Sequence, residues 1–151
     1  MNNYRNISTL KRQERFVSVS PPSKIMVVDD QPLSLLQAVD LVNYDGYDSI
    51  ECMDSREVME LAFKYQPDVI LMDIFMPEIN GLEVAKRLKL QPQTKSIPIV
   101  LMSVTDEPNL WQQALKIGVE EVILKPLEYY YLHQKIKSLT KFCSKGFNPH
   151  K

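Results

Sequence analysis

The chain has 151 residues, of which 44% are hydrophobic and 25% are charged, so a single globular domain is expected. Its formal net charge of −1 argues against a general electrostatic attraction to nucleic acid or to a membrane surface. Two cysteines, Cys52 and Cys143, are too few for a disulfide scaffold. No signal peptide is recognisable, and no apolar run approaches the roughly 20 residues of a membrane span, so a cytoplasmic location is expected.

Residues 1–23 form the first distinct segment of the chain. They are polar, carry four basic residues against one acidic residue, and end in a Ser-Pro-Pro-Ser sequence. Because proline cannot continue a helix, the segment is predicted to be a flexible N-terminal extension leading into the domain. Two alternatives stay open: a docking arm, since Tyr4, Ile7 and Leu10 are spaced three apart, and a transit peptide, since the segment is basic.

From Lys24 onward, short apolar runs alternate with segments of helical periodicity. The apolar runs predict strands, and the continuous hydrophobicity of the first one is typical of a strand that is covered on both faces. The predicted strands span residues 24–29, 48–52, 67–73, 99–102 and 122–124.

The helical segments between these runs carry start and stop signals. Pro32 suits a first helical position, Asp54–Glu57 resembles a capping box, and Gly118 is a usual stop after a helix. Helices are predicted from Pro32, from Val58, and over residues 81–90, 109–117 and 127–142, with inward faces formed by Leu35, Val39 and Val42; Val58, Leu61, Ala62 and Tyr65; Val84, Ala85 and Leu88; and Tyr131, Leu132, Ile136 and Leu139. Residues 143–151 are predicted to be a disordered tail.

Four of the apolar runs end in polar groups, which are Asp29 with Asp30, Asp73, Ser103 and Lys125. Strict alternation of strands and helices predicts a doubly wound parallel sheet, in which these strand ends meet in one crevice where such folds bind ligands. Three carboxylates placed together repel one another unless a cation lies between them, and Mg²⁺ prefers carboxylates together with phosphate oxygens and waters. The sequence therefore predicts a divalent-metal and phosphoryl site.

The chemistry of such a site assigns each group a role. The Asp73 carboxylate can act as a nucleophile and form an acyl-phosphate, Mg²⁺ and Lys125 can neutralise the phosphoryl oxygens, and Ser103 can donate a hydrogen bond. Structural alternatives stay open: the acidic pair as a helix N-cap, Lys125 as an ion-pair partner of Asp73, and Ser103 as a strand-end cap. His133 and His150 are expected to face solvent, so a zinc site has little support.

Five segments together carry motifs of a known family: Val27–Asp30, Leu71–Pro77, Asn80–Glu83, Leu101–Ser103 and Gly118–Pro126. In this order and spacing they resemble the receiver domain of two-component response regulators, from Lys24 to about Leu139. The resemblance implies an α/β, flavodoxin-like fold over residues 24–142, with a doubly wound sheet of five parallel strands in the order 2-1-3-4-5.

This resemblance implies that Asp73 is the phosphoacceptor and that Mg²⁺ is the cofactor. Asp29, Asp30 and Asp73 then supply carboxylates to the metal, and the backbone carbonyl of Phe75 supplies a further ligand. Gly81 is expected to give the loop after Asp73 its tight turn.

It also implies how the phosphoryl group is delivered and sensed. Ser103 is the expected switch hydroxyl, Lys125 is the phosphate-pairing lysine, and the Lys125–Pro126 peptide bond is expected to be cis. The phosphodonor would be a phosphohistidine on a sensor histidine kinase or a histidine phosphotransfer protein, and residues 103–140 would present the signal to a downstream protein of unknown identity. No direct binding of nucleic acid or membrane is expected, and homodimer formation stays open.

The expected domain is a signalling domain, not an enzyme, although it would assist its own Mg²⁺-dependent phosphorylation and dephosphorylation. No output domain follows Phe142, so the chain is interpreted as a stand-alone regulator or an excised receiver, and its starting Met1 favours the first.

A few residues depart from the family's pattern. Val122 stands three residues before the lysine, where many receivers have an aromatic switch residue, and Tyr129–Tyr131 are candidates to substitute for it. Trp111 and these tyrosines form an aromatic concentration near the predicted output surface. Val104 stands where the family usually has a small residue, and Phe75 is also bulky. We hypothesise that both crowd the acyl-phosphate and make it long-lived.

Other functional classes fit the residues less well. A flavin-binding protein of the same architecture would need a hydroxyl-rich phosphate loop where Asp29 and Asp30 stand. An aspartyl-nucleophile phosphatase would need a second acid at the position of Phe75. A pseudo-receiver, an interaction module that works without phosphorylation, stays open because of Val104 and Val122.

Overall fold

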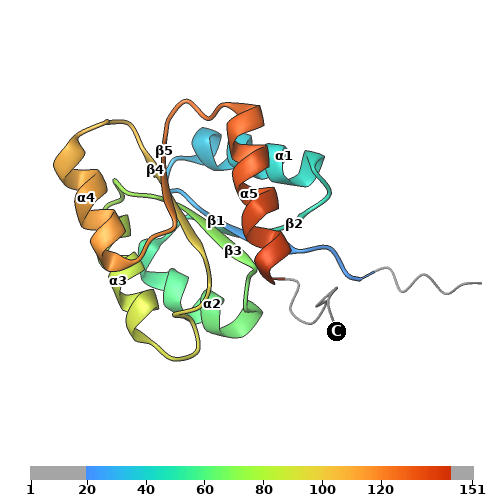
Figure 1. Cartoon of the computed structure of the whole chain (residues 1–151), viewed down its shortest axis with the longest axis horizontal. Helices are drawn as coiled ribbons and strands as arrows, with labels where there is room; N and C mark the ends of the chain where they lie inside the picture. The colour runs from blue at the N-terminus through green and yellow to red at the C-terminus, as the bar shows by residue number, and fades with distance from the viewer. Residues whose placement is uncertain (1–19, 144–151) are drawn as a thin grey trace, which may run out of the picture.

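The computed structural model describes residues 20–143, and the predictions for residues 1–19 and 144–151, including His150, lie outside this range. Within it, strands and helices alternate along the chain, as Figure 1 shows. Their order is β1 (Lys24–Val28), α1 (Pro32–Tyr44), β2 (Asp48–Cys52), the 3₁₀ turn η1 (Ser55–Glu57), α2 (Val58–Tyr65), β3 (Val69–Asp73), α3 (Gly81–Leu90), β4 (Ile99–Ser103), α4 (Pro108–Ile117), β5 (Glu121–Leu124) and α5 (Tyr129–Cys143).

The five described strands form one parallel sheet in the order β2-β1-β3-β4-β5, which confirms the predicted fold class and strand order. The register pairs Val28 with Met72, Asp73 with Met102, and Ser103 with Leu124. The carboxyl ends of the strands therefore lie along one edge of the sheet, as the sequence predicts.

Helices cover both faces of this sheet. In Figure 1, α1 and α5 lie on one face, and α2, α3 and α4 lie on the other. Strands β3 and β4 are buried at every position because each has a helical layer on both sides, which explains their continuous apolar sequences. Most predicted inward residues are buried, namely Leu35, Val39, Val42, Val58, Ala62, Val84, Ala85, Leu88, Leu132 and Ile136.

Two expectations about the last helix are wrong. Tyr131 was expected to face inward, but 49% of it is exposed, because successive helical residues are rotated by roughly 100° and the buried stripe of α5 runs through Leu132 and Ile136. His133 was expected to face solvent, but its ring is half-buried, with Nδ1 2.8 Å from the Asp45 carboxylate. The contact joins residues 88 positions apart in the sequence, so local pattern could not reveal it.

The local signals at helix ends have mixed outcomes. Gly118 adopts the left-handed conformation, with φ of 99°, and ends α4 as predicted. Pro32 opens α1, also as predicted. Asp54, in contrast, does not cap α2: its carboxylate accepts the backbone N–H of Arg56 and caps the short turn η1 that precedes the helix. No helix in residues 20–143 has the length and apolar character needed to cross a membrane.

Candidate functional site

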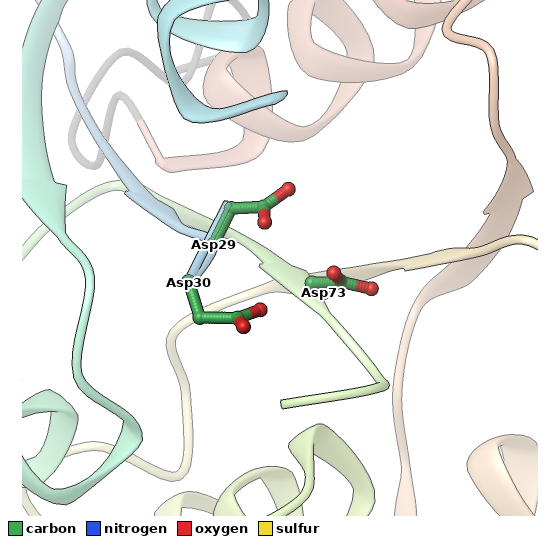
Figure 2. A group of neighbouring side chains, drawn as sticks. All are labelled: Asp29, Asp30 and Asp73. Carbon is green, nitrogen blue, oxygen red and sulfur yellow. The ribbon is translucent and has the colours of Figure 1, made fainter. Parts of the chain in front are cut away.

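The polar groups predicted from the strand ends gather at the carboxyl edge of the sheet. Asp29 and Asp30 follow β1, Asp73 ends β3, and Figure 2 shows their carboxylates lying near one another. One oxygen of each lies within 4.8 Å of an oxygen of the other two. Lys125 follows β5 and reaches into the same cluster, with Nζ 2.6 Å from Asp29 Oδ2 and 3.1 Å from Asp73 Oδ2.

Lys125 holds this cluster together through all three of its N–H donors. Besides the two carboxylates, its ammonium donates to the Ser34 hydroxyl at 2.8 Å. Burial acts to lower the pKa of Lys125, but the hydrogen bond to Asp29 and the negative charges of Asp73 and Asp29 outweigh it and raise the pKa above its usual value. The lysine therefore stays charged at neutral pH. Its predicted alternative, an ion pair to Asp73, is present in this structure.

Asp73 is almost fully buried and its two oxygens differ in their contacts. Oδ2 is paired with Lys125, whereas Oδ1 accepts only a long bond of 3.4 Å from the backbone N–H of Phe75 among the hydrogen bonds of the described residues. Burial raises the pKa of Asp73 more than the Lys125 charge lowers it, so the pKa lies above that of an ordinary aspartate. Oδ1 is consequently the more weakly hydrogen-bonded of the two Asp73 oxygens among the described residues.

Gly81 brings the next loop back against the end of β3. Its backbone N–H donates to the Ile74 carbonyl at 2.7 Å, and a Cβ at this position would lie only 2.3 Å from the carbonyl oxygen of Asp73. Only glycine can approach the strand this closely, which gives the predicted tight turn a specific reason. Asn80 then caps α3 by accepting the backbone N–H of Glu83.

The acidic residues after β1 fit a divalent cation. Asp29 has no exposed surface and uses Oδ1 to accept the backbone N–H of Gln31. Asp30 Oδ1 is buried and has no hydrogen-bond partner among the described residues, which is costly for a carboxylate unless an ion or water satisfies it. Gln31, not an aspartate, is the N-cap residue of α1, so the helix-cap alternative does not account for the pair. An all-oxygen donor set of this kind suits Mg²⁺.

Ser103 lies at the predicted position but its hydroxyl points into its own loop. Oγ donates to the Thr105 carbonyl at 2.7 Å and accepts the Thr105 N–H at 3.1 Å, which is the strand-end arrangement considered as an alternative. The predicted cis bond between Lys125 and Pro126 is present. Phe75 and Val104 are exposed at 50% and 69%, beside the end of β3 and β4, whereas Val122 is buried in the core.

Ser34 is the site residue that sequence reasoning missed. It lies in the first turn of α1, and its hydroxyl accepts from Lys125, which follows β5 and is 91 positions away in the sequence. A serine in an amphipathic helix gives no chemical signal by itself. The spacing from an acidic pair would have been the only available clue.

Comparison with known proteins agrees with this geometry. Residues 25–137 match the response regulator receiver domain family. The chain is 33% identical to the polar-differentiation response regulator DivK of Brucella anthropi, covering 78% of this chain and 95% of DivK. It is 34% identical to the response regulator PleD of Caulobacter vibrioides, covering 80% of this chain but only 26% of PleD.

A solved structure gives the same result. The chemotaxis response regulator CheY4 of Vibrio cholerae superimposes with a TM-score of 0.73 at 26% identity, covering 78% of this chain and 98% of CheY4. The chain therefore belongs to the response regulator receiver domain family.

Proposed function

We propose that this chain accepts a phosphoryl group on Asp73 from a phosphohistidine and passes the signal on through protein contacts. The observation that supports it best is the convergence of Lys125 Nζ with the Asp29 and Asp73 carboxylates, at 2.6 and 3.1 Å. Asp30 Oδ1 belongs to the same cluster and has no hydrogen-bond partner within residues 20–143. A lysine and three carboxylates, one of them the buried Asp73, at one edge of the sheet are the groups that phosphoryl transfer to a carboxylate requires.

In the proposed reaction Asp73 Oδ1 attacks the phosphorus of the phosphohistidine. The new O–P bond gives an acyl-phosphate, the P–N bond breaks, and the imidazole leaves with the bonding electron pair. Lys125 exchanges its contact with Asp73 Oδ2 for one with a phosphoryl oxygen while Asp29 and Ser34 keep its ammonium in place. The charge of the lysine offsets the negative charge that phosphorylation adds to the crevice.

Mg²⁺ is the proposed cofactor. Asp29, Asp30 and Asp73 would hold it, with the backbone carbonyl of Phe75 as a further ligand. When bound there, the ion would neutralise phosphoryl oxygens and the neighbouring carboxylates.

The proposed partners follow from this chemistry. The donor is a sensor histidine kinase or a histidine phosphotransfer protein, and the acceptor of the signal is a protein that contacts residues 103–140. A hollow of about 390 Å³ lies in that region, lined by Trp111, Val122, Ile123, Leu124, Pro126, Glu128 and Tyr131. Leu124 and Tyr131 are partly exposed there, which suits contact with a protein better than contact with nucleic acid. Homodimer formation and a cytoplasmic location remain predictions.

A mass measurement tests the proposal directly. The protein is incubated with Mg²⁺ and acetyl phosphate, or with a phosphorylated histidine donor, and the intact mass is followed. We expect a gain of one phosphoryl group that Asp73→Asn abolishes and that Asp40→Asn, a change at an exposed aspartate on α1, leaves intact.

A wild-type protein that takes no phosphoryl group from any donor would contradict the proposal. That result would favour the alternative of an interaction module that works without phosphorylation. The hydrogen bonds that hold the Ser103 hydroxyl to Thr105 are the observation on the side of that alternative.

A further inference from the structure

Ser103 and Trp111 share one hydrogen-bond acceptor. The Ser103 hydroxyl donates to the carbonyl oxygen of Thr105 at 2.7 Å, and the indole Nε1 of Trp111 donates to the same oxygen at 3.3 Å. The backbone N–H of Thr105 also donates a hydrogen bond to Ser103 Oγ. Trp111 lies in the first turn of α4 and is half-buried against the core. The Thr105 carbonyl oxygen therefore accepts two hydrogen bonds, one from Ser103 and one from Trp111.

Trp111 has a connection that the other candidate aromatic residues lack. Val122, at the position where an aromatic residue was expected, is buried and has no side-chain donor. The Tyr129 hydroxyl is bound to Asp45 at 2.7 Å, and Tyr130 and Tyr131 are exposed. Among the described aromatic side chains, the indole of Trp111 is the one that hydrogen-bonds into the loop of Ser103.

We propose that Trp111 is a positioning residue for Ser103, an inference that rests on the proposed function. The Ser103 hydroxyl must leave the Thr105 carbonyl before it can turn toward a phosphoryl group on Asp73. By fixing that carbonyl, Trp111 stabilises the position in which the hydroxyl is bound to Thr105. Because the two positions are in equilibrium, a contact that favours one of them opposes phosphorylation, and phosphorylation in turn weakens the contact.

The same geometry links the crevice to the surface. Trp111 lines the hollow that it shares with Val122, Leu124 and Tyr131, on the side of α4 that faces β5 and α5. A movement of the Thr105 carbonyl would therefore change the position of the Trp111 indole, which forms part of the lining of this hollow. The buried Val122 is not needed for this connection.

Removing the indole donor should make the phosphorylated state easier to reach. Trp111→Phe keeps an aromatic ring in the core but deletes Nε1–H. We expect the variant to bind beryllofluoride, an analogue of the phosphoryl group, about two- to tenfold more tightly in the presence of Mg²⁺, the factor that one net hydrogen bond accounts for. Calorimetry measures this affinity. Leu115→Ala, at an exposed position on the same helix, should leave it unchanged.

A double-mutant cycle separates positioning from packing. In a Ser103→Ala background, where the hydroxyl is absent, Trp111→Phe should no longer change the affinity for beryllofluoride. The fluorescence of Trp111, the single tryptophan of the chain, gives an independent measurement. The emission of Trp111 should change when the wild-type protein is phosphorylated on Asp73. In the Ser103→Ala variant the emission should stay constant, although intact-mass measurement shows the same extent of phosphorylation.

The failure of this inference is distinguishable from failure of the proposed function. If wild-type protein is phosphorylated on Asp73 but Trp111→Phe has wild-type affinity, or its effect persists in Ser103→Ala, Trp111 does not position Ser103. An emission that is constant in phosphorylated wild-type protein leads to the same conclusion. If Asp73 takes no phosphoryl group at all, the proposed function fails and this inference fails with it.

Discussion

Gly81 shows how a single residue without a side chain fixes the geometry of Asp73. A Cβ at position 81 would meet three backbone atoms of Asp73 and Ile74, the nearest at 2.3 Å. Backbone atoms cannot rotate away as the end of a flexible side chain can. The loop or the strand would therefore have to shift, and the acceptor carboxylate would shift with it.

We expect Gly81→Ala to destabilise the protein by about 3 kcal/mol, since overpacking against backbone has no easy relief. Gly46→Ala is the matched control. Gly46 has φ of +86° but no atom within 4 Å of its ideal Cβ, so its substitution should cost only about 1 kcal/mol of conformational strain. Urea unfolding of the two variants and the wild type measures the difference, and equal costs would contradict this explanation.

Single residues also show what sequence could and could not predict. Asp29, Asp30, Asp73 and Lys125 could be predicted because charged groups at the ends of apolar runs are conspicuous. The structure brings one oxygen of each carboxylate within 4.8 Å of the others and places Lys125 within hydrogen-bonding distance of Asp29 and Asp73. The hydroxyl of Ser34 was missed because its role depends on Lys125, which follows β5 and reaches across to the start of α1. The orientation of Ser103 was equally unpredictable, since it is set by a loop carbonyl.

At the scale of elements, α5 was predicted over residues 127–142 and spans Tyr129–Cys143. The side that it turns toward the core and its contacts with the end of α1 were not predicted. The end of α1 and the start of α5 are joined by Asp45, whose carboxylate accepts the Tyr129 hydroxyl at 2.7 Å and lies 2.8 Å from His133 Nδ1. The Tyr129 and His133 rings are stacked, and the Tyr44 ring meets that of Tyr129 edge-on. Periodicity locates a helix, but such contacts require knowing which helices are neighbours.

This junction gives the stability of the protein a pH dependence. Burial acts to raise the pKa of Asp45, but hydrogen bonds from Tyr129 and His133 and the charge of His133 outweigh it and hold the pKa below its usual value. A lowered pKa in the folded state means that the ionised form stabilises the fold. That contribution is complete above the unfolded pKa of about 3.9 and is lost as the pH falls through the lower folded value.

We expect Asp45→Asn to cost about 1 kcal/mol of stability at pH 7 and progressively less as the pH falls below about 4. Urea unfolding over a range of pH measures the difference from wild type. Asp40→Asn, at an exposed position on the same helix, should change stability by no more than about 0.5 kcal/mol. A cost for Asp45→Asn that does not vary with pH would contradict the role given to its charge.

At the scale of the whole molecule, the crevice is assembled from strand ends that are far apart in the sequence and that the open parallel sheet brings together. Phe75 lies in the loop after β3 and Val104 in the loop after β4, and both expose apolar side chains next to the strand ends that carry Asp73 and Ser103. The alternation of elements was sufficient to predict this edge. The exposure of the Phe75 and Val104 side chains at this edge was not predictable, because it depends on the path of each loop.

We expect these two side chains to slow the attack of water on phosphorylated Asp73. The double variant Phe75→Ala with Val104→Ala should lose its phosphoryl group about tenfold faster, which corresponds to about 1.4 kcal/mol in the barrier. Release of phosphate from the purified phospho-protein measures the rate. Leu90→Ala, at an exposed position at the end of α3, serves as the control. A wild-type half-life of seconds would contradict the hypothesis of a protected acyl-phosphate.

The position of β3 in the sheet has a consequence for where signalling motion can occur. This strand has a hydrogen-bonded neighbour on each side, β1 and β4, and a helical layer on each face. Its amides should be among the slowest in the protein to exchange with deuterated water, because opening them breaks two ladders at once. The phosphoryl group would thus be attached to a part of the chain that hardly deforms, and the differences between the two signalling states should be confined to the connecting loops and the helices that they carry.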